Sequence, residues 1–243
     1  MDTFLILQYD NRKVTNDFIK LMKINKKYCS KYNYDYVFIK KQYDLPPYWI
    51  KVYLLQHFLQ TNKYKGILWI DMDACIHNFD IRLEDIVIKD KYFYKSPDNK
   101  IWKSSFNAGV FLVLNNEIGM NIMNDWMKCY NKTKWHKTGR NKWTTNCKWA
   151  GVCYEQGSFE KYISPKYNKY IQTFDWSFFQ SFYSNLLEKE NKCVFTLHFA
   201  GDEIKKEIPD YLKSLKSKER HQTAKNPCKF LKNKTRKRQS SNK

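Results

Sequence analysis

The sequence predicts an α/β protein built on a wound, mostly parallel sheet of the Rossmann type, with helices flanking the sheet. Three short apolar runs alternate with two amphipathic segments over the first 70 residues of the 243-residue chain. The resulting order of strand, helix, strand, helix and strand is typical of sheets with right-handed crossovers. The first and third runs both end in polar, acidic sequence, and such sheets bind ligands at the carboxyl ends of their strands.

Each of these elements has its own sequence signal. Phe4–Leu7 is a continuous apolar run, as expected for a strand that is buried on both faces. Thr15 offers an N-cap to a helix that extends to about residue 31, and Pro46 with Pro47 opens a second helix. The second and third strands are predicted at residues 36–39 and 66–70.

The rest of the chain predicts further strands and helices, a long loop and a tail. The predicted strands and helices lie at residues 92–94, 106–114, 117–130, 154–163 and 194–198. Residues 131–150 are polar, basic and rich in tryptophan, which favours a loop. The apolar pattern thins out after Pro209. We therefore predict a single domain over residues 1–213 and a disordered basic tail over residues 214–243.

The formal charge of +20 raises nucleic-acid binding as a function. From residue 205 to 243, however, the chain has 14 Lys or Arg against 3 acidic residues, so much of the charge lies in the predicted tail. Positive charge in a tail indicates where the protein attaches more than which reaction it catalyses. It indicates a tail that can bind an anionic surface.

The seven cysteines are scattered, odd in number and without a CxxC pair. We interpret them as reduced thiols of a reducing compartment, with a zinc site at Cys147 and Cys153 as the less favoured alternative. The sequence has neither a signal peptide nor an apolar run of 18 residues. These features predict a cytoplasmic or otherwise soluble protein without a transmembrane segment, and they leave its oligomeric state open.

Asp71 and Asp73 follow directly on the third predicted strand. Two carboxylates at this spacing suit a hard divalent cation such as Mg²⁺ or Mn²⁺, which commonly adds phosphate oxygens from a substrate. Such a cation would offset the charge of a leaving diphosphate. The alternative is that Asp71 only ends the strand and that Asp73 is solvated.

Six segments, taken in order, resemble one enzyme family. They are Tyr28–Tyr36, Trp49–Lys51, Ile67–Ile76 with its Asp-x-Asp, Phe106–Leu112, Glu155–Phe159 and His198–Gly201. Together they are similar to the GT-A glycosyltransferases and in particular to glycosyltransferase family 34, which holds galactosyl-, mannosyl- and xylosyltransferases. A resemblance to the glycogenin-like family 8 also survives, because that family shares the Asp-x-Asp and the final His-x-x-Gly segment. The resemblance implies a GT-A fold and transfer of a sugar from a nucleotide sugar.

The resemblance also implies a metal site and a phosphate site. His198 would be the third metal ligand, beside Asp71 and Asp73. The alternative is that His198 binds no metal. Gly201 would let the backbone approach the diphosphate. Lys205 or Lys206 would add positive charge there, unless both belong to the basic tail.

The donor would occupy the ends of several strands. Family members hold the base and ribose near the end of the first strand, here Gln8, Tyr9 and Asp10. Lys51 would reach the phosphates, with a snorkelling lysine as the alternative. Asn107-Ala108-Gly109 would bind the donor sugar, with a plain strand bulge as the alternative.

The family retains anomeric configuration, which implies a role for Glu155 and Gln156. A double displacement needs a carboxylate nucleophile, for which Glu155 is the local candidate. A front-face mechanism needs only electrostatic stabilisation, which the Gln156 carbonyl supplies beneath the sugar while Glu155 positions hydroxyls. The resemblance favours the second mechanism. The alternative is that both side chains face solvent.

The acceptor would be a glycan or glycoprotein bound over residues 128–149. The three tryptophans 135, 143 and 149 would stack on sugars, and Lys134, His136 and Arg140 would meet acidic groups, unless this region is a mobile loop.

The leading hypothesis is therefore a metal-dependent galactosyltransferase-like enzyme that uses a UDP-sugar or, less favoured, GDP-mannose. The alternatives are a nucleic-acid-binding or nuclease-like basic protein and an inactive module that binds sugar nucleotides.

Overall fold

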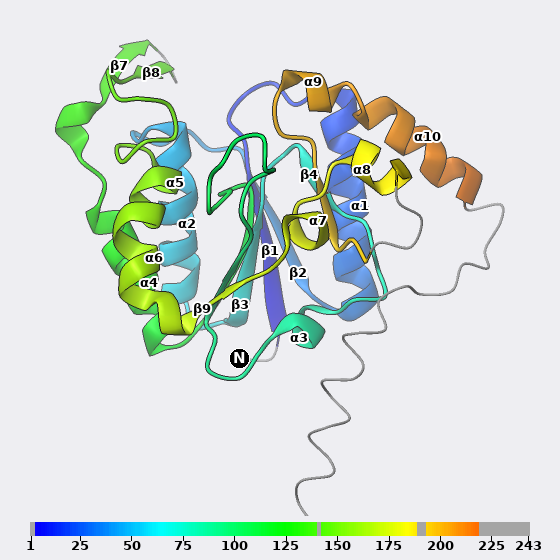
Figure 1. Cartoon of the computed structure of the whole chain (residues 1–243), viewed down its shortest axis with the longest axis horizontal. Coiled ribbons are helices and arrows are strands. Elements are labelled where there is room, and N and C mark those ends of the chain that lie inside the picture. The colour runs from blue at the N-terminus through cyan, green and yellow to red at the C-terminus, as the bar shows by residue number, and fades with distance from the viewer. Residues whose placement is uncertain (1–2, 140–141, 189–192, 219–243) are drawn as a thin grey trace, which may run out of the picture.

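The computed structural model describes residues 3–139, 142–188 and 193–218, and within them a six-stranded sheet lies between two layers of helices (Figure 1). The strands of the main sheet are β1 (Thr3–Tyr9), β2 (Asp35–Ile39), β3 (Tyr64–Ile70), β5 (Phe93–Lys95), β6 (Val110–Leu114) and β9 (Ile171–Thr173). Two small pairs are β4 (Ala74–Ile76) with β10 (Thr196–His198), and β7 (His136–Gly139) with β8 (Lys142–Thr144).

The helices differ widely in length. They are α1 (Asn16–Tyr32), α2 (Pro47–Gln60), α3 (Leu83–Ile86), α4 (Glu117–Lys128), η1 (Lys132–Lys134), α5 (Glu155–Ser158), η2 (Phe159–Ile163), α6 (Ser164–Tyr167), η3 (Asn168–Tyr170), α7 (Trp176–Phe179), α8 (Tyr183–Glu188), α9 (Asp202–Lys205) and α10 (Ile208–Lys218). In Figure 1, α2, α4, α5 and α6 cover one face of the sheet, and α1, α7, α8 and α10 lie on the other side.

The main sheet is mixed but mostly parallel. Its strand order is β2-β1-β3-β6-β5-β9, and β6 runs antiparallel to both of its neighbours. The other paired strands are parallel. The predicted fold class is therefore confirmed, and the carboxyl ends of β1 and β3 lie side by side at one edge of the sheet.

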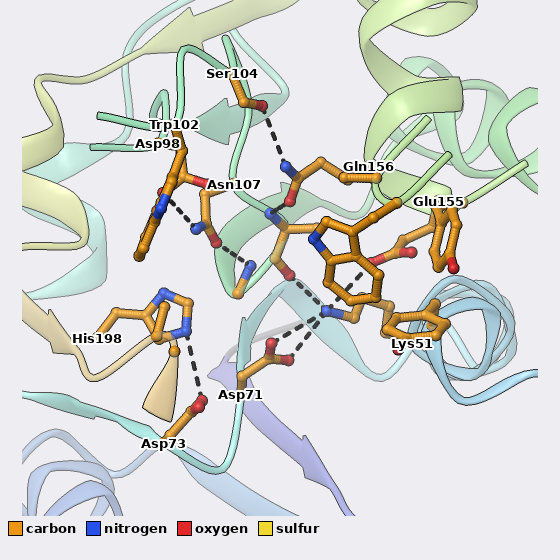
Figure 2. Close-up of a pocket in the computed structure, with 18 of the residues that line it drawn as sticks. Lys51, Asp71, Asp73, Asp98, Trp102, Ser104, Asn107, Glu155, Gln156 and His198 are labelled. Atoms are coloured by element: carbon orange, nitrogen blue, oxygen red, sulfur yellow. Dashed lines mark hydrogen bonds and ion pairs between the residues drawn. The ribbon is translucent and has the colours of Figure 1, made fainter. Parts of the chain in front are cut away.

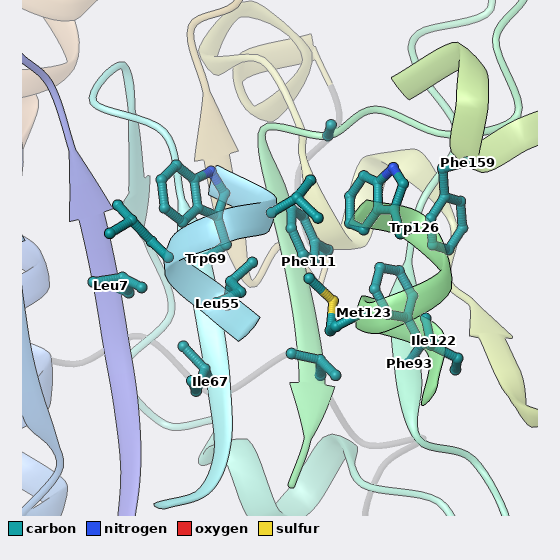
Figure 3. Close-up of a cluster of buried hydrophobic side chains, with 14 of the residues drawn as sticks. Leu7, Leu55, Ile67, Trp69, Phe93, Phe111, Ile122, Met123, Trp126 and Phe159 are labelled. Carbon is teal, nitrogen blue, oxygen red and sulfur yellow. The ribbon is translucent and has the colours of Figure 1, made fainter. Parts of the chain in front are cut away.

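The five elements predicted over the first 70 residues are all present. The Thr15 side chain accepts a hydrogen bond from the Phe18 amide and so caps α1, and Pro47 begins α2. Apolar side chains on both faces of β1 and β3 explain their continuous apolar sequence. Leu7, Ile67 and Trp69 join the core beneath α2 and α4 (Figure 3), whereas the alternate residues pack towards α1.

The structure differs from the sequence-based prediction in the second half of the chain. The predicted strand at 106–114 begins only at Val110, because the Asn107 side chain accepts from the Gly109 amide and turns the backbone. The predicted loop at 131–150 contains the β7–β8 hairpin. Helix α10 extends through Ser214 to Lys218, so the predicted domain boundary falls inside a helix. The remaining tail, residues 219–243, lies outside the described residues.

None of the helices in the described ranges combines the length and the apolar character needed to cross a membrane.

Candidate active site

A cavity of about 710 Å³ opens beyond the carboxyl ends of β1 and β3 (Figure 2). Most of the residues that the sequence singles out line it. These are Lys51, Asp71, Asp73, Asn107, Ala108, Gly109, Glu155, Gln156, His198 and Gly201. Residues that are up to 150 positions apart in the sequence therefore meet in one place, as the resemblance implied.

Asp71 is held in place by two neighbours. The Trp69 indole Nε1 donates to its Oδ1 at 2.7 Å, and Lys51 Nζ lies 3.1 Å from Oδ1 and 3.3 Å from Oδ2. Its backbone amide donates to the Gly109 carbonyl at 2.8 Å, which continues the pairing of β3 with β6. The carboxylate is therefore oriented before any ligand arrives.

Asp73 lies in the turn between β3 and β4, beside two cationic or basic groups. His198 Nε2 is 3.4 Å from its Oδ1, and Lys205 Nζ is 3.4 Å from its Oδ2. Burial raises the pKa of Asp73, but the hydrogen bond and charge of His198 and the charge of Lys205 lower it by more, so the net shift is downward. The side chain is thus an anion at neutral pH.

Strand pairing brings His198 to the acidic pair. In the antiparallel β4–β10 pair, His198 is opposite Ala74, one residue after Asp73. The imidazole is buried, and its Nδ1 lies 2.9 Å from Oε1 of Gln180. The other ring nitrogen, Nε2, faces Asp73.

Asp71, Asp73 and His198 are chemically suited to one divalent cation. Each offers one ligand atom, and these atoms lie within 4.8 Å of one another. Two carboxylates and a neutral imidazole make a mixed oxygen and nitrogen set that Mn²⁺ accepts readily and Mg²⁺ accepts less well. The residues present therefore fit the implied metal.

Gly109 gives the imidazole its space. A Cβ at this position would lie 2.1 Å from Cε1 of His198, which no side chain could tolerate without moving the ring. The predicted small residue is thus required by the close approach of His198.

Lys51 connects the acidic pair to Glu155 (Figure 2). Its Nζ donates to the Ala108 carbonyl at 2.8 Å and lies 3.6 Å from Glu155 Oε1. Burial lowers the pKa of Lys51, but Asp71 and Glu155 raise it by more. The ammonium is buried and surrounded by partners, so we assign it to the structure of the site. This differs from the predicted direct phosphate contact.

Glu155 is buried, and its two carboxyl oxygens differ in their contacts. Among the described residues, its Oε2 has no hydrogen-bond partner. Burial raises the pKa of Glu155 to about 7, although Lys51 pulls it down. The group therefore titrates near neutral pH, and one of its oxygens is buried without a hydrogen-bond partner among the described residues.

The Gln156 amide is already engaged at both ends. Its Oε1 accepts from the Ala108 amide at 3.1 Å, and its Nε2 donates to Ser104 Oγ at 3.1 Å. The carbonyl keeps one lone pair for a ligand. Of the two predicted catalytic side chains, Glu155 thus has the freer oxygen.

Three indoles fix the backbone beside these residues. Trp49 and Trp135 both donate to the Cys153 carbonyl, at 2.9 and 3.2 Å, and Trp126 donates to the Glu155 carbonyl at 2.8 Å. The start of α5 is therefore attached to α2, to α4 and to the segment before β7.

The predicted base and ribose residues at the end of β1 do not line the cavity. Gln8 is fully buried, and its amide donates to the Asp71 carbonyl and accepts from the Tyr36 hydroxyl. Its predicted ligand contact is therefore wrong, and it supports Asp71 from behind. Tyr9 is also buried in the core, and the Asp10 carboxylate pairs with Arg12 at 2.6 Å.

Residues 201–206 divide between the cavity and the surface. Gly201 adopts φ +86°, a left-handed conformation that glycine takes without strain, and it lines the cavity together with Lys205. Lys206 instead pairs with Glu203 at 2.7 Å on the surface. Of the two predicted lysines, only Lys205 reaches the site.

Sequence reasoning missed several contributors to the site, among them Arg12, Asp98 and Gln180. Arg12 and Asp98 line the cavity, and Gln180 contacts His198. Burial raises the pKa of Asp98, and the Asn107 amide donates to it at 3.0 Å. Arg12 follows the polar end of β1 and could have been suspected, but no motif marks Asp98 or Gln180.

An aromatic wall, composed of Tyr48, Trp149 and Tyr154, lines the same cavity as the metal ligands. The three rings meet edge to face, with centroids 5.0–5.3 Å apart. Trp149 is 67% exposed. The predicted stacking role is structurally available only to Trp149, because Trp135 is buried behind the wall and Trp143 lies in the β7–β8 hairpin. Arg140 lies outside the described residues.

The prediction of reduced cysteines was wrong for three of the cysteines in the described ranges, because Cys147, Cys153 and Cys193 are all disulfide-bonded. Cys147 and Cys153 form a disulfide, with Cα atoms 6.2 Å apart. The turns between them bring the two side chains together, which their sequence spacing did not reveal. This pairing excludes the zinc alternative and removes the argument for a reducing compartment. The disulfide closes the loop that carries Trp149.

Residues 4–100 match the galactosyl transferase GMA12/MNN10 family, also called glycosyltransferase family 34. This range contains the Asp-x-Asp and the two segments before it, so the predicted resemblance is confirmed there. The segments around Asn107, Glu155 and His198 lie outside the matched range. No curated protein sequence matches the chain.

Two solved structures share the fold. One is a glycosyltransferase involved in glycosylation of the major capsid of PBCV-1, with a TM-score of 0.66 and 15% identity over 85% of this chain and 99% of that one. The other is apo GlyE of Streptococcus pneumoniae TIGR4, with a TM-score of 0.51 and 12% identity over 89% of this chain and 64% of that one. At such identities the likeness concerns the fold, which is that of GT-A enzymes.

Proposed function

We propose that this chain, a glycosyltransferase with the GT-A fold, transfers a sugar from a nucleoside diphosphate sugar to a glycan or glycoprotein with the help of a divalent cation. The observation that carries the proposal is the convergence of Asp71, Asp73 and His198 within 4.8 Å at one cavity. A UDP-sugar is the favoured donor, GDP-mannose the second candidate, and Mn²⁺ or Mg²⁺ the cation. When bound, the cation supplies Lewis-acid neutralisation of the leaving diphosphate.

Two side chains are free to meet the diphosphate. Lys205 lines the cavity, contacts Asp73 and is about one third exposed. The Arg12 guanidinium is anchored to Asp10 and also lines the cavity. Arg12 can bind phosphate oxygens in a bidentate manner, and Lys205 contributes a point charge. Both therefore bind and orient the donor, whereas Lys51 maintains the geometry of Asp71.

Glu155 and Gln156 lie where the transferred sugar would sit. The unpaired Oε2 of Glu155 accepts a hydrogen bond from a hydroxyl of the donor or acceptor, or stabilises positive charge that develops at the anomeric carbon. The Gln156 carbonyl, fixed by the Ala108 amide, provides a second oriented dipole. A front-face reaction with retention uses both groups without a covalent intermediate.

The aromatic wall is the side of the cavity that suits an acceptor sugar. Trp149 presents an exposed indole on this side of the cavity. Flat aromatic faces bind the apolar faces of sugars. The predicted acceptor region is thus reduced to Trp149 and its neighbours.

Calorimetric titration with a panel of UDP-sugars and GDP-mannose, with Mn²⁺, with Mg²⁺ and without metal, tests the proposal. We expect binding of at least one donor that requires metal and is lost in Asp73→Ala. Asp44→Ala removes an exposed carboxylate that pairs with Lys137 and serves as the matched control. Absence of metal-dependent binding for every donor, with folded protein, would refute the proposal.

Turnover separates an enzyme from the inactive module considered above. A binding-competent protein should hydrolyse its donor slowly or transfer the sugar to a glycan acceptor, and NMR of the product gives the anomeric configuration. Binding without any turnover would favour the inactive module. We do not favour the nuclease-like alternative, because the fold and the family match are those of glycosyltransferases.

A further inference from the structure

Gln180 lies behind the proposed metal site and has no place in the function described so far. It follows α7 directly, is 1% exposed and does not line the cavity. Its Oε1 nevertheless lies 2.9 Å from Nδ1 of His198. A buried polar side chain so close to a metal ligand has a consequence for the state of that ligand.

The neighbours of Gln180 determine which way its amide points. The Nε2 group donates to the carbonyl oxygens of Asn107 at 2.9 Å and of Val110 at 3.2 Å, and it also lies 2.9 Å from Ser96 Oγ. Carbonyl oxygens have no proton to donate, so only the NH₂ end can face them. The oxygen of the amide must then face the imidazole.

This orientation in turn determines the tautomer of His198. The Gln180 oxygen can only accept, so Nδ1 must bear the proton. A neutral imidazole with its proton on Nδ1 has its lone pair on Nε2. Nε2 is the nitrogen that faces Asp73.

A second contact restricts the ring itself. Because a Cβ at position 109 would lie 2.1 Å from Cε1, the ring packs directly against the backbone of Gly109. Gln180 holds the Nδ1 edge, and the Gly109 backbone limits movement of the ring at the neighbouring Cε1. Both contacts involve residues at the start of β6, since Gln180 binds the carbonyls of residues 107 and 110.

We propose that Gln180 is a positioning residue that fixes His198 as the Nδ1–H tautomer and presents Nε2 to the cation. The inference rests on the proposed metal site and adds the residue that determines its nitrogen ligand. Gln180 acts through His198 and touches neither substrate nor cation.

The first experiment measures Mn²⁺ affinity of the full chain without nucleotide, by calorimetry. Gln180→Met keeps the volume and removes the acceptor, and we expect a 10- to 100-fold weaker Kd, as is typical for loss of such a partner. In a His198→Ala background the same substitution should change Kd less than about twofold. An equal loss in both backgrounds, or no loss in either, would overturn the proposal.

A conservative variant separates positioning from stability. Gln180→Glu keeps an acceptor for the Nδ1 proton but no longer donates to the carbonyls of residues 107 and 110. We expect it to lower Tm while recovering most of the Mn²⁺ affinity that Gln180→Met loses. If Gln180 only stabilises the fold, Kd per folded molecule will be the same in wild type and in both variants.

The tautomer can be read without any metal. In protein with ¹⁵N-labelled histidine, at a pH where the ring is neutral, long-range ¹H–¹⁵N spectra should assign the His198 proton to Nδ1. Titration with diamagnetic Cd²⁺ should then move the Nε2 signal. A proton on Nε2 would overturn the inference even if Mn²⁺ binds. Failure of Mn²⁺ to bind wild-type protein would instead refute the proposed function and leave the tautomer as an independent result.

Discussion

The two sides of the cavity are held in different ways. The metal wall, composed of Asp71, Asp73, Gly109 and His198, is fixed by strand ends and by buried polar contacts such as that of Gln180. The aromatic wall is fixed by packed rings, by indole hydrogen bonds to two carbonyls and by a disulfide. The first arrangement orients charges, and the second defines a shape. Donor and acceptor binding should therefore respond to different substitutions.

The largest expected effect comes from Lys51, which pairs with Asp71 of the metal wall and with Glu155. Lys51→Met leaves the buried carboxyl of Glu155 and the partly exposed carboxyl of Asp71 without their cation, and we expect a loss of about 3 kcal/mol in the free energy of unfolding. Bound Mn²⁺ should restore part of the lost stability, because its positive charge offsets the negative charge of Asp71. Urea unfolding with and without Mn²⁺ measures both quantities.

Lys95→Met provides the matched comparison for Lys51. Lys95 is also buried, but its Nζ donates to the Ser105 carbonyl and makes no ion pair among the described residues. We expect a loss of only about 1–2 kcal/mol, because a single carbonyl is left unsatisfied, and no effect of Mn²⁺ on that loss. Equal losses in the two variants would show that Lys51 does not link Asp71 and Glu155 electrostatically.

Gly109→Ala should damage the metal wall alone. The added methyl group displaces the His198 ring, so we expect Mn²⁺ affinity to fall by at least about tenfold and stability to fall by about 1–3 kcal/mol. Gly139→Ala in the hairpin, where a Cβ would meet only the Lys142 side chain at 3.8 Å, is the control. Wild-type Mn²⁺ affinity in Gly109→Ala would contradict the packing described above.

Cys147→Ser should affect the aromatic wall alone. Opening so short a loop should cost about 2 kcal/mol and should loosen Trp149. We expect the KM for a glycan acceptor to rise while donor and Mn²⁺ affinities stay unchanged. A parallel loss of donor binding would show that the two walls are not independent.

A last effect, spread over several pH units, is a pH dependence that originates at Glu155. Its pKa is about 7 in the folded state and 4.5 without burial, so between these values the folded protein binds a proton that the unfolded chain does not. This contribution to stability is complete below pH 4.5 and is lost as the pH rises through 7, with a slope of at most about 1.4 kcal/mol per pH unit. Glu155→Gln cannot ionise, so its Tm relative to wild type should rise from pH 5 to pH 8. A constant difference would contradict the raised pKa.

The same contrast separates what the sequence could predict from what it could not. Asp71 and Asp73 were predictable because an apolar strand that ends in two carboxylates is a local pattern. His198 needed the family resemblance, because only the β4–β10 pairing brings it close. Gln8 was misassigned because the sequence does not reveal that the end of β1 is buried on both faces of the sheet.

The aromatic wall was harder to predict, because its contacts are long-range. A polar segment rich in tryptophan has the sequence of a mobile loop, because its tertiary contacts with carbonyl groups elsewhere in the chain are not visible in the sequence. The sequence separation between Trp49 and Cys153 is 104 residues. The disulfide and Gln180 likewise depend on tertiary contacts that no motif marks.

The double hydrogen bond to the Cys153 carbonyl has a consequence for how the chain opens. The two indole donors come from α2 and from the segment between α4 and β7, so the backbone at residues 153–155 cannot detach unless those elements also separate. We therefore expect its amides to exchange with solvent only through cooperative, large-scale opening, unlike those of an ordinary surface loop. A protease that cuts readily in the β7–β8 hairpin should leave residues 153–158 intact until the whole domain unfolds.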